Sequence, residues 1–225
     1  PDWVAREMLK LANLGVKTLR ISDEMFFLNK RYYTPILERA VQESFGFNMW
    51  TYSRIDTVRR DALALFKNAG VNWLALGVEA GNQFVRQEVS KGSFKEVNIF
   101  GFPEDDLDTM QQTLDLALEL NTEMANMYPC QALPGSPMHN LAKKNGWSLP
   151  DSFEGYGFLS YEAQPLPTKY LSSAEVLQFR DDAWQKYFTN PAYLNLVESR
   201  FGVDQRKNVE NMALIKLNRK LLEKN

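Results

Sequence analysis

The stretch Trp73-Leu74-Ala75-Leu76-Gly77-Val78-Glu79-Ala80-Gly81 decides the predicted fold. It is a short apolar run that ends in one carboxylate, Glu79, and a glycine, Gly81. Apolar runs of this length between turn signals are typical of strands buried on both faces of a parallel sheet. A carboxylate at the carboxyl end of such a strand lies where α/β proteins bind their ligands, so Glu79 is predicted at the mouth of an open (β/α) barrel. The alternative is that Glu79 only starts the next helix, where acids are favoured.

The residues before this stretch repeat one pattern of helix, glycine and strand. Helical spacing covers residues 2–14, 30–44 and 57–69, and strand patterns cover 16–21, 47–52 and 73–78. Strands that alternate with helices of this length are typical of βαβ units and a parallel sheet. Right-handed crossovers then place the helices on the outside of the sheet.

The pattern continues downstream with less regular spacing. Residues 82–91 are predicted to be a helix, and a strand at 97–100 is broken by Gly101-Phe102-Pro103. The acids at 104–106 start a further helix, where negative charge suits the helix dipole, and a last strand covers 124–132. The connection between the third and fourth strands is barely long enough for a crossover. We therefore expect a segment to be absent near residue 93.

The character of the chain changes after Gly146. Residues 147–171 show no clear period and are predicted to be irregular, whereas 172–189, 191–201 and 204–223 are helical patterns. Ser172 and Glu175 have the spacing of a capping box at the start of the first of these helices. We predict a partial barrel over 1–146 and, over 147–225, an irregular arm and C-terminal helices that pack on it.

The bulk composition excludes several partners. The 225 residues carry a net charge of −2 with acids and bases interspersed, which gives no signal for nucleic acid or anionic membranes. Apolar runs are all shorter than the roughly 20 residues that span a bilayer, and no signal peptide is present. A single cysteine, Cys130, excludes an internal disulfide and fits a cytoplasmic location. The chain opens Pro1-Asp2-Trp3 without a methionine, so we expect its beginning to be missing.

Six short motifs, in order, carry a family resemblance. The chain resembles radical S-adenosylmethionine enzymes, in the subgroup whose members also have an N-terminal cobalamin-binding domain. Each motif alone is weakly specific, but the resemblance covers most of the chain, and the motifs follow in the right order at predicted strand ends. The motifs are Ile21-Ser22-Asp23-Glu24-Met25-Phe26, Thr51-Tyr52-Ser53-Arg54-Ile55-Asp56-Thr57, Leu76-Gly77-Val78-Glu79-Ala80-Gly81-Asn82, Ser90-Lys91-Gly92, Phe100-Gly101-Phe102-Pro103 and Leu133-Pro134-Gly135-Ser136-Pro137.

The resemblance implies an α/β fold, a partial parallel (β/α)6 barrel that lacks its first strand here and has a helical C-terminal extension. S-adenosylmethionine would lie across the carboxyl ends of the strands. The positions that match cofactor-binding residues of the family are Asp23-Glu24 at the methionine amine, Ser53 or Arg54 at the ribose or methionyl carboxylate, Glu79 at the ribose hydroxyls, Lys91 at the methionyl carboxylate, and Gly101-Phe102-Pro103 beside adenine.

One departure from the family is large. The defining Cys-x3-Cys-x2-Cys loop, whose three thiolates hold a [4Fe–4S] cluster, is absent from the chain. We expect these ligands upstream of Pro1, together with the cobalamin domain, and we predict no metal ligand within the chain.

The implied function is that of a fragment of a radical S-adenosylmethionine enzyme, dependent on cobalamin. Such enzymes use an electron donor to generate a 5′-deoxyadenosyl radical, here for methyl transfer or rearrangement at an unactivated carbon of an unknown small-molecule substrate. Two alternatives stay open. One is a catalytically inactive barrel remnant that acts as a binding or scaffolding module. The other is an unrelated barrel enzyme with ordinary acid–base chemistry, for which Asp23, Glu24, Asp56 and Glu79 are the available carboxylates.

Overall fold

A computed structural model describes residues 1–23, 25–54, 57–77, 80–82, 85 and 98–223. The described residues divide into two compact units, the first within Pro1–Gly77 and the second from Ala80 onward. Each contains one parallel sheet with α-helices, so the predicted α/β class and parallel pairing are confirmed. Closure of the two sheets into one (β/α)6 barrel, and a boundary between domains near residue 146, stay predictions.

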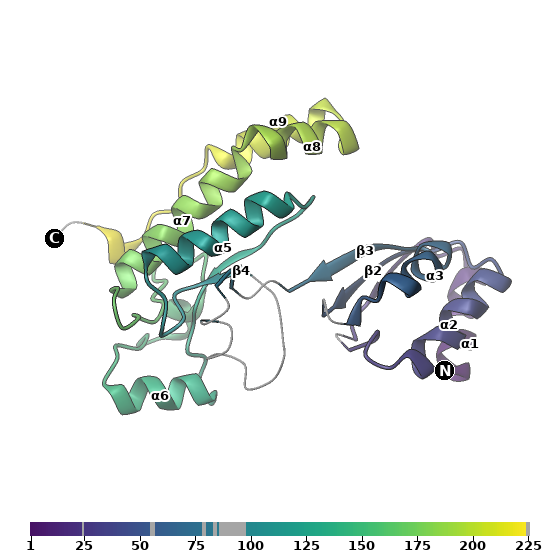
Figure 1. Ribbon diagram of the computed structural model, residues 1–225, viewed down its shortest axis with the longest axis horizontal. Coiled ribbons are helices and arrows are strands. Elements are labelled where there is room, and N and C mark those ends of the chain that lie inside the picture. The colour runs from purple at the N-terminus through teal and green to yellow at the C-terminus, as the bar shows by residue number, and fades with distance from the viewer. Residues whose placement is uncertain (24, 55–56, 78–79, 83–84, 86–97, 224–225) are drawn as a thin grey trace. The chain divides into compact units, whose positions relative to one another are not determined.

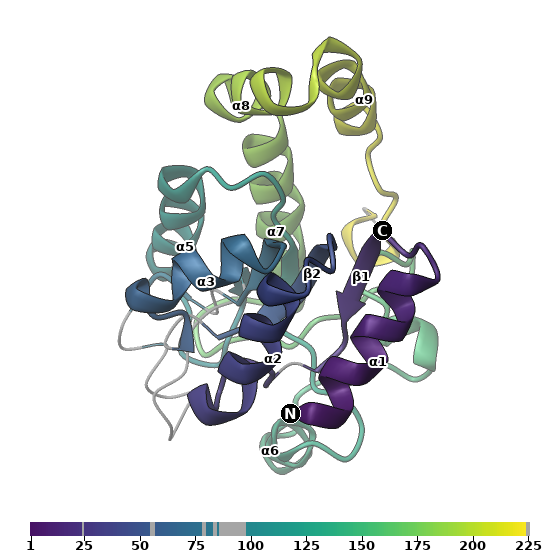
Figure 2. The same cartoon turned by 90° about the vertical axis from the view of Figure 1, so that its right-hand side faces the viewer.

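The first unit alternates helices and strands in the predicted order. Its sheet has the order β1-β2-β3, and all neighbours are parallel. In Figures 1 and 2 the helices α1, α2 and α3 lie along one face of this sheet. The elements are α1 (Asp2–Asn13), β1 (Thr18–Ile21), α2 (Lys30–Gln42), β2 (Asn48–Ser53), the 3-10 turn η2 (Arg60–Ala62), α3 (Leu63–Asn68) and β3 (Val71–Leu76).

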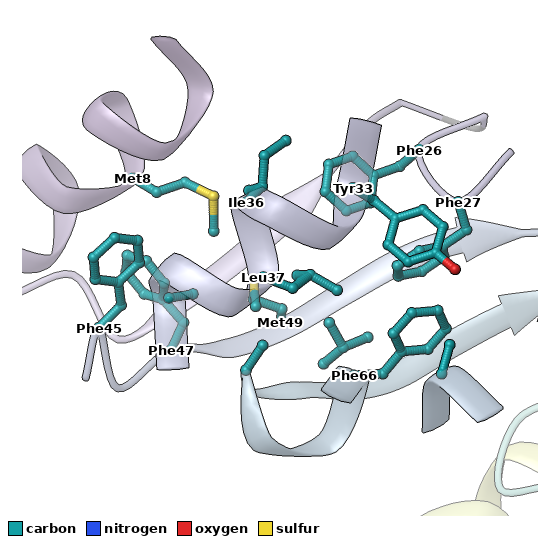
Figure 3. Close-up of a cluster of buried hydrophobic side chains, with 14 residues drawn as sticks. Met8, Phe26, Phe27, Tyr33, Ile36, Leu37, Phe45, Phe47, Met49 and Phe66 are labelled. Atoms are coloured by element: carbon teal, nitrogen blue, oxygen red, sulfur yellow. The ribbon is translucent and has the colours of Figure 1, made fainter. Parts of the chain in front are cut away.

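Aromatic side chains fill the core between these helices and the sheet (Figure 3). Phe27 stacks on Phe66 with ring centroids 4.1 Å apart, and Tyr33 meets both rings edge-on. Phe26 and Phe27 come from the turn after β1, so that turn is anchored in the core rather than only at the surface. Burying such rings stabilises the fold by about 1.5–3 kcal/mol each.

The second unit packs its helices against a two-stranded parallel sheet, β4-β5. α5 and α7 lie beside each other (Figures 1 and 2) and share a core with both strands, built around Phe100, Met110, Met127 and Val176. The elements are β4 (Asn98–Phe100), α5 (Leu107–Leu120), β5 (Met127–Pro129), α6 (Pro137–Asn145), η3 (Phe153–Tyr156), α7 (Ser173–Phe188), α8 (Pro191–Phe201), α9 (Val203–Ala213) and η4 (Lys220–Leu222).

Helix starts in this unit follow the local sequence closely. Ser172 and Glu175 form the predicted capping box of α7, in which Ser172 Oγ accepts from Glu175 N and the Glu175 carboxylate accepts from Ser172 N. Asp106 caps α5 in the same reciprocal way with Thr109. The irregular arm is also confirmed, because only the short turn η3 interrupts residues 147–171.

Several element boundaries differ from the prediction. The last strand, predicted over 124–132, is the shorter β5 (Met127–Pro129), and the first strand begins at Thr18 rather than 16. The helix predicted at 57–69 begins later, because N–H and hydroxyl of Thr57 both donate to the Arg54 carbonyl and hold a turn there. Strand β3 begins at Val71 rather than 73. The helix predicted at 204–223 ends at Ala213, since the chain beyond it runs to tertiary contacts of Arg219 and Lys220. The helix predicted at 82–91 and the segment expected to be absent near residue 93 lie almost wholly outside the described residues.

Candidate functional site

Asp23 is held in a tight turn directly after β1. Its Oδ1 accepts the N–H of Met25 at 2.9 Å, and its carbonyl accepts the N–H of Phe26. Because Phe26 is buried in the core, the turn has a fixed position while the Asp23 side chain stays exposed. The remaining carboxylate oxygen can therefore accept from a ligand such as an ammonium group.

The end of β2 carries Ser53 and Arg54, which point to different surroundings. Ser53 is buried, and its hydroxyl lies 3.0 Å from the Thr57 hydroxyl. Met49 lies four residues before Ser53 on the same strand and belongs to the core beneath the helices. Side chains alternate between the two faces of a strand, so Ser53 also lies on the helix side. Arg54 follows the last residue of β2 and is half-buried, so it is the more accessible of the two predicted contacts.

The register of the first sheet brings Asp23 and the Ser53-Arg54 pair to the same end of the sheet, where the strands finish. Ile21 of β1 pairs with Thr51 of β2, and the strands are parallel, so Asp23 and Ser53 leave neighbouring strands at corresponding positions. A carboxylate and a guanidinium at one sheet edge match the ammonium and carboxylate groups of an amino acid. The other predicted contacts, Glu24, Glu79 and Lys91, lie outside the described residues.

In the second unit, the turn after β4 is fastened by a buried carboxylate. Gly101 has a left-handed backbone conformation, with φ of 87°. Oδ2 of Asp105 accepts the N–H groups of Gly101 and Phe102 at 3.0 and 2.9 Å, and Oδ1 accepts the Thr109 hydroxyl at 2.8 Å. The predicted adenine-flanking turn Gly101-Phe102-Pro103 is therefore a rigid feature of this unit.

Asp105 was not recognised from the sequence, where the acids at 104–106 indicated only a helix start. That interpretation holds for Asp106, which caps α5, but Asp105 is buried and fixes the preceding turn. Burial raises the pKa of Asp105, and its hydrogen bonds from Thr109, Phe102 and Gly101 oppose that rise. No sequence signal separates a capping acid from a buried one at this spacing.

The carboxyl end of β5 lies beside the carboxyl end of β4, because Phe100 pairs with Pro129 in parallel strands. The next residue, Cys130, is buried among apolar side chains, where a cysteine packs as a small hydrophobe. The side-chain nitrogen and oxygen of Gln131 are both buried, and neither has a hydrogen-bond partner among the described residues. An unpaired buried amide costs about 1–3 kcal/mol, so a bound polar ligand would stabilise this position. Sequence analysis did not single out Gln131.

Two further findings concern metals and membranes. Within the described ranges, no group of three histidine, cysteine, aspartate or glutamate residues is arranged to hold a metal ion. None of the helices in the described part of the chain combines the length and apolar character needed to cross a bilayer.

Comparison with known proteins gives distant relatives only. No family model matches the chain. An uncharacterized methyltransferase of Pyrococcus horikoshii is 20% identical over 198 residues, which is 80% of this chain and 42% of that protein. An anaerobic magnesium-protoporphyrin IX monomethyl ester cyclase of Rubrivivax gelatinosus is 23% identical over 195 residues, 77% of this chain and 34% of that protein.

A cyclase of the same name from Synechocystis is 30% identical over 96 residues, which is 41% of this chain and 19% of that protein. The chain thus spans less than half the length of the curated relatives that it matches. At low identity, it is similar to proteins named as a methyltransferase and as cyclases, all of them enzymes.

Proposed function

We propose that this chain is part of a radical S-adenosylmethionine enzyme that carries out methyl transfer or rearrangement at an unactivated carbon. The observation that carries the proposal is the placement of Asp23 and Arg54 after neighbouring parallel strands, at one edge of a sheet. The distant similarity to a methyltransferase and to cyclases over most of the chain supports it.

In the first unit, the proposed ligand contacts are to the methionyl end of S-adenosylmethionine. The Asp23 turn would accept from the ammonium group, and the Arg54 guanidinium would pair with the carboxylate. Glu24, Glu79 and Lys91 stay proposed contacts on the basis of the resemblance alone. Holding both ends of the amino acid would orient the sulfonium centre, and orientation of this kind is a large part of what a protein adds to cofactor chemistry.

For the second unit by itself, the resemblance gives a proposed contact with an adenine ring. The rigid turn at Gly101-Phe102-Pro103 would flank the ring, and the unpaired amide of Gln131 would meet its polar edge. An amide fits this partner because adenine presents both a donor and an acceptor, as the amide does. Binding would then satisfy a buried group that lacks a partner in the rest of the described chain.

The cofactors that complete the proposal require residues outside these 225. A [4Fe–4S] cluster would supply the electron that cleaves S-adenosylmethionine to a 5′-deoxyadenosyl radical. One cysteine, Cys130, cannot provide its three thiolate ligands. Cobalamin as a methyl carrier follows from the subgroup resemblance and is proposed on that ground only.

The test is anaerobic reconstitution of the complete gene product that carries these residues, with iron, sulfide and a reductant. We expect S-adenosylmethionine to be consumed and 5′-deoxyadenosine to form. Arg54→Gln should weaken S-adenosylmethionine binding by about tenfold, because one charge-assisted contact is lost. Arg60→Gln, which changes an exposed arginine of the same unit, should bind as the unaltered protein does.

The possible outcomes separate the two functions. Absence of 5′-deoxyadenosine from a protein with an intact three-cysteine loop and a formed cluster contradicts the enzyme. Binding of S-adenosylmethionine without cleavage by such a protein would favour a binding module.

A further inference from the structure

Arg20 of β1 is fixed against two aromatic rings of β2. Its guanidinium carbon lies 4.6 Å from the ring centroid of Trp50 and 5.4 Å from that of Tyr52. Its Nη2 donates to the Tyr52 hydroxyl at 2.7 Å. The two rings meet edge-on, with centroids 4.6 Å apart, so the guanidinium has a defined position although the residue is exposed.

These side chains lie on the face of the sheet opposite α1, α2 and α3. Leu19, Ile21 and Met49 belong to the core under the helices, and alternation along each strand turns Arg20, Trp50 and Tyr52 to the other face. Trp73 pairs in register with Trp50 and therefore shares that face. We call Arg20, Trp50, Tyr52 and Trp73 the arginine–aromatic cluster.

The charge of this cluster is not compensated within the described ranges of the chain. Among the residues that the structure describes, no carboxylate forms an ion pair with Arg20, and its one hydrogen-bond partner is the neutral Tyr52 hydroxyl. A guanidinium has five N–H donors in a rigid fork that matches a carboxylate, and a fork already held in place loses little entropy on binding. Aromatic rings around it favour a ligand that is flat and conjugated.

We propose that the arginine–aromatic cluster binds the carboxylate of a flat, conjugated substrate. The inference rests on the proposed function, because within a (β/α) barrel the sheet face opposite α1, α2 and α3 would line the interior, where the substrate reacts. It assigns a substrate class that the resemblance does not provide. The Arg20 guanidinium would fix the carboxylate, and the tryptophan rings would hold the conjugated part.

The experiment measures binding of two probes by isothermal titration with the complete protein, in the absence of S-adenosylmethionine and reductant. The probes are 2-naphthoate and 2-naphthamide, which share one ring system and differ in charge. We expect 2-naphthoate to bind about tenfold more tightly than the amide, since one charge-assisted, two-point contact distinguishes them.

Variants then locate the site. Arg20→Gln should abolish the preference for 2-naphthoate, whereas Arg31→Gln, an exposed arginine of α2, should retain it. Tyr52→Phe removes one hydroxyl and should weaken 2-naphthoate several-fold while leaving the amide unchanged, which keeps the test decisive if Arg20→Gln does not fold. Equal affinity for the two probes, no binding of either, or full affinity in the folded variants would overturn the proposal.

Failure here is distinguishable from failure of the proposed function. Probe binding requires neither the [4Fe–4S] cluster nor cleavage of S-adenosylmethionine. If 2-naphthoate binding depends on Arg20 but the protein forms no 5′-deoxyadenosine, the carboxylate site is supported and the radical enzyme is contradicted. Formation of 5′-deoxyadenosine by a protein that does not prefer 2-naphthoate would support the radical enzyme and overturn the carboxylate site.

Discussion

Arg219 forms a two-point ion pair with Asp181 of α7, in which Nε and Nη2 each lie 2.8 Å from a carboxylate oxygen. The Arg219 side chain is 1% exposed, and its Nη1 donates to the Ser160 carbonyl at 2.8 Å. Asp181 also accepts from Arg180, which is itself buried and bonded to the Met127 carbonyl of β5. The C-terminal segment and the irregular arm are thus tied to α7 through one carboxylate.

The first prediction concerns this carboxylate. Asp181→Asn should lower the free energy of unfolding by about 3–5 kcal/mol, because two buried guanidinium groups lose their shared counter-ion. Burial lowers the pKa of Arg180, because desolvation disfavours its charged form, and Asp181 opposes that effect. Arg219→Met should cost less, since Asp181 keeps Arg180. Denaturant unfolding measures both, with Asp182→Asn as an exposed control; equal losses in Asp181→Asn and Asp182→Asn would contradict the prediction.

Gly101 and Gly135 provide a matched pair of glycines in the second unit. Both have positive φ, 87° and 85°, but a Cβ on Gly101 would lie 2.3 Å from Cγ1 of Val176, whereas Gly135 has open space. Gly135→Ala should cost about 1–2 kcal/mol of backbone strain. Gly101→Ala should cost about 1–3 kcal/mol more through overpacking. Thermal unfolding checks this, and adding Val176→Ala should recover part of the difference; no recovery would show that the collision is not the cause.

Asp105 gives a prediction about pH. Burial raises the pKa of this carboxyl in the folded chain, so the stability linked to it is full below the unfolded pKa and is lost as the pH rises through the folded pKa. The free energy of unfolding of the wild type, relative to Asp105→Asn, should therefore fall between pH 4 and pH 7. Chemical unfolding at both pH values measures the difference. Asp108→Asn, which changes an exposed acid of α5, serves as the control. A wild-type advantage over Asp105→Asn that grows with pH would contradict the assignment.

The same carboxylate gives a separate prediction about the turn. Asp105→Ala should lower the free energy of unfolding by about 1–3 kcal/mol, because the N–H groups of Gly101 and Phe102 lose their acceptor. Amide hydrogen exchange at these two positions should accelerate in Asp105→Ala and stay slow in Asp105→Asn, which keeps an oxygen acceptor. Unchanged exchange in the alanine variant would show that the turn does not depend on Asp105.

Tyr33 carries a hydroxyl that is buried without a hydrogen-bond partner in the described part of the chain. Its ring packs edge-on against Phe27 and Phe66. Tyr33→Phe keeps the ring and removes the unpaired group, so it should raise the free energy of unfolding by about 1–3 kcal/mol. Tyr33→Leu, which loses the ring contacts, should lower it. Calorimetry distinguishes the two, and a destabilised phenylalanine variant would mean that the hydroxyl has a partner in solution.

The sequence by itself determined the local elements and their class. Hydrophobic periodicity and the positions of glycine and proline predicted the strands around 18–21, 48–53 and 71–76, the irregular arm, and the capping box at Ser172 and Glu175. These features depend on residues that are close together along the chain. It also predicted that Asp23 and Ser53 or Arg54 follow adjacent parallel strands, which the register bears out.

Only the tertiary structure decided which polar groups are buried and what they contact. Asp105, Gln131 and Asp181 have ordinary sequence surroundings, and their roles come from residues that pack against them in the folded unit. The early end of α9 has the same origin, because the contacts of Arg219 with Asp181 and Ser160 outweigh local helix propensity. Local patterns report the periodicity of a segment, whereas desolvation and long-range pairing depend on the whole fold.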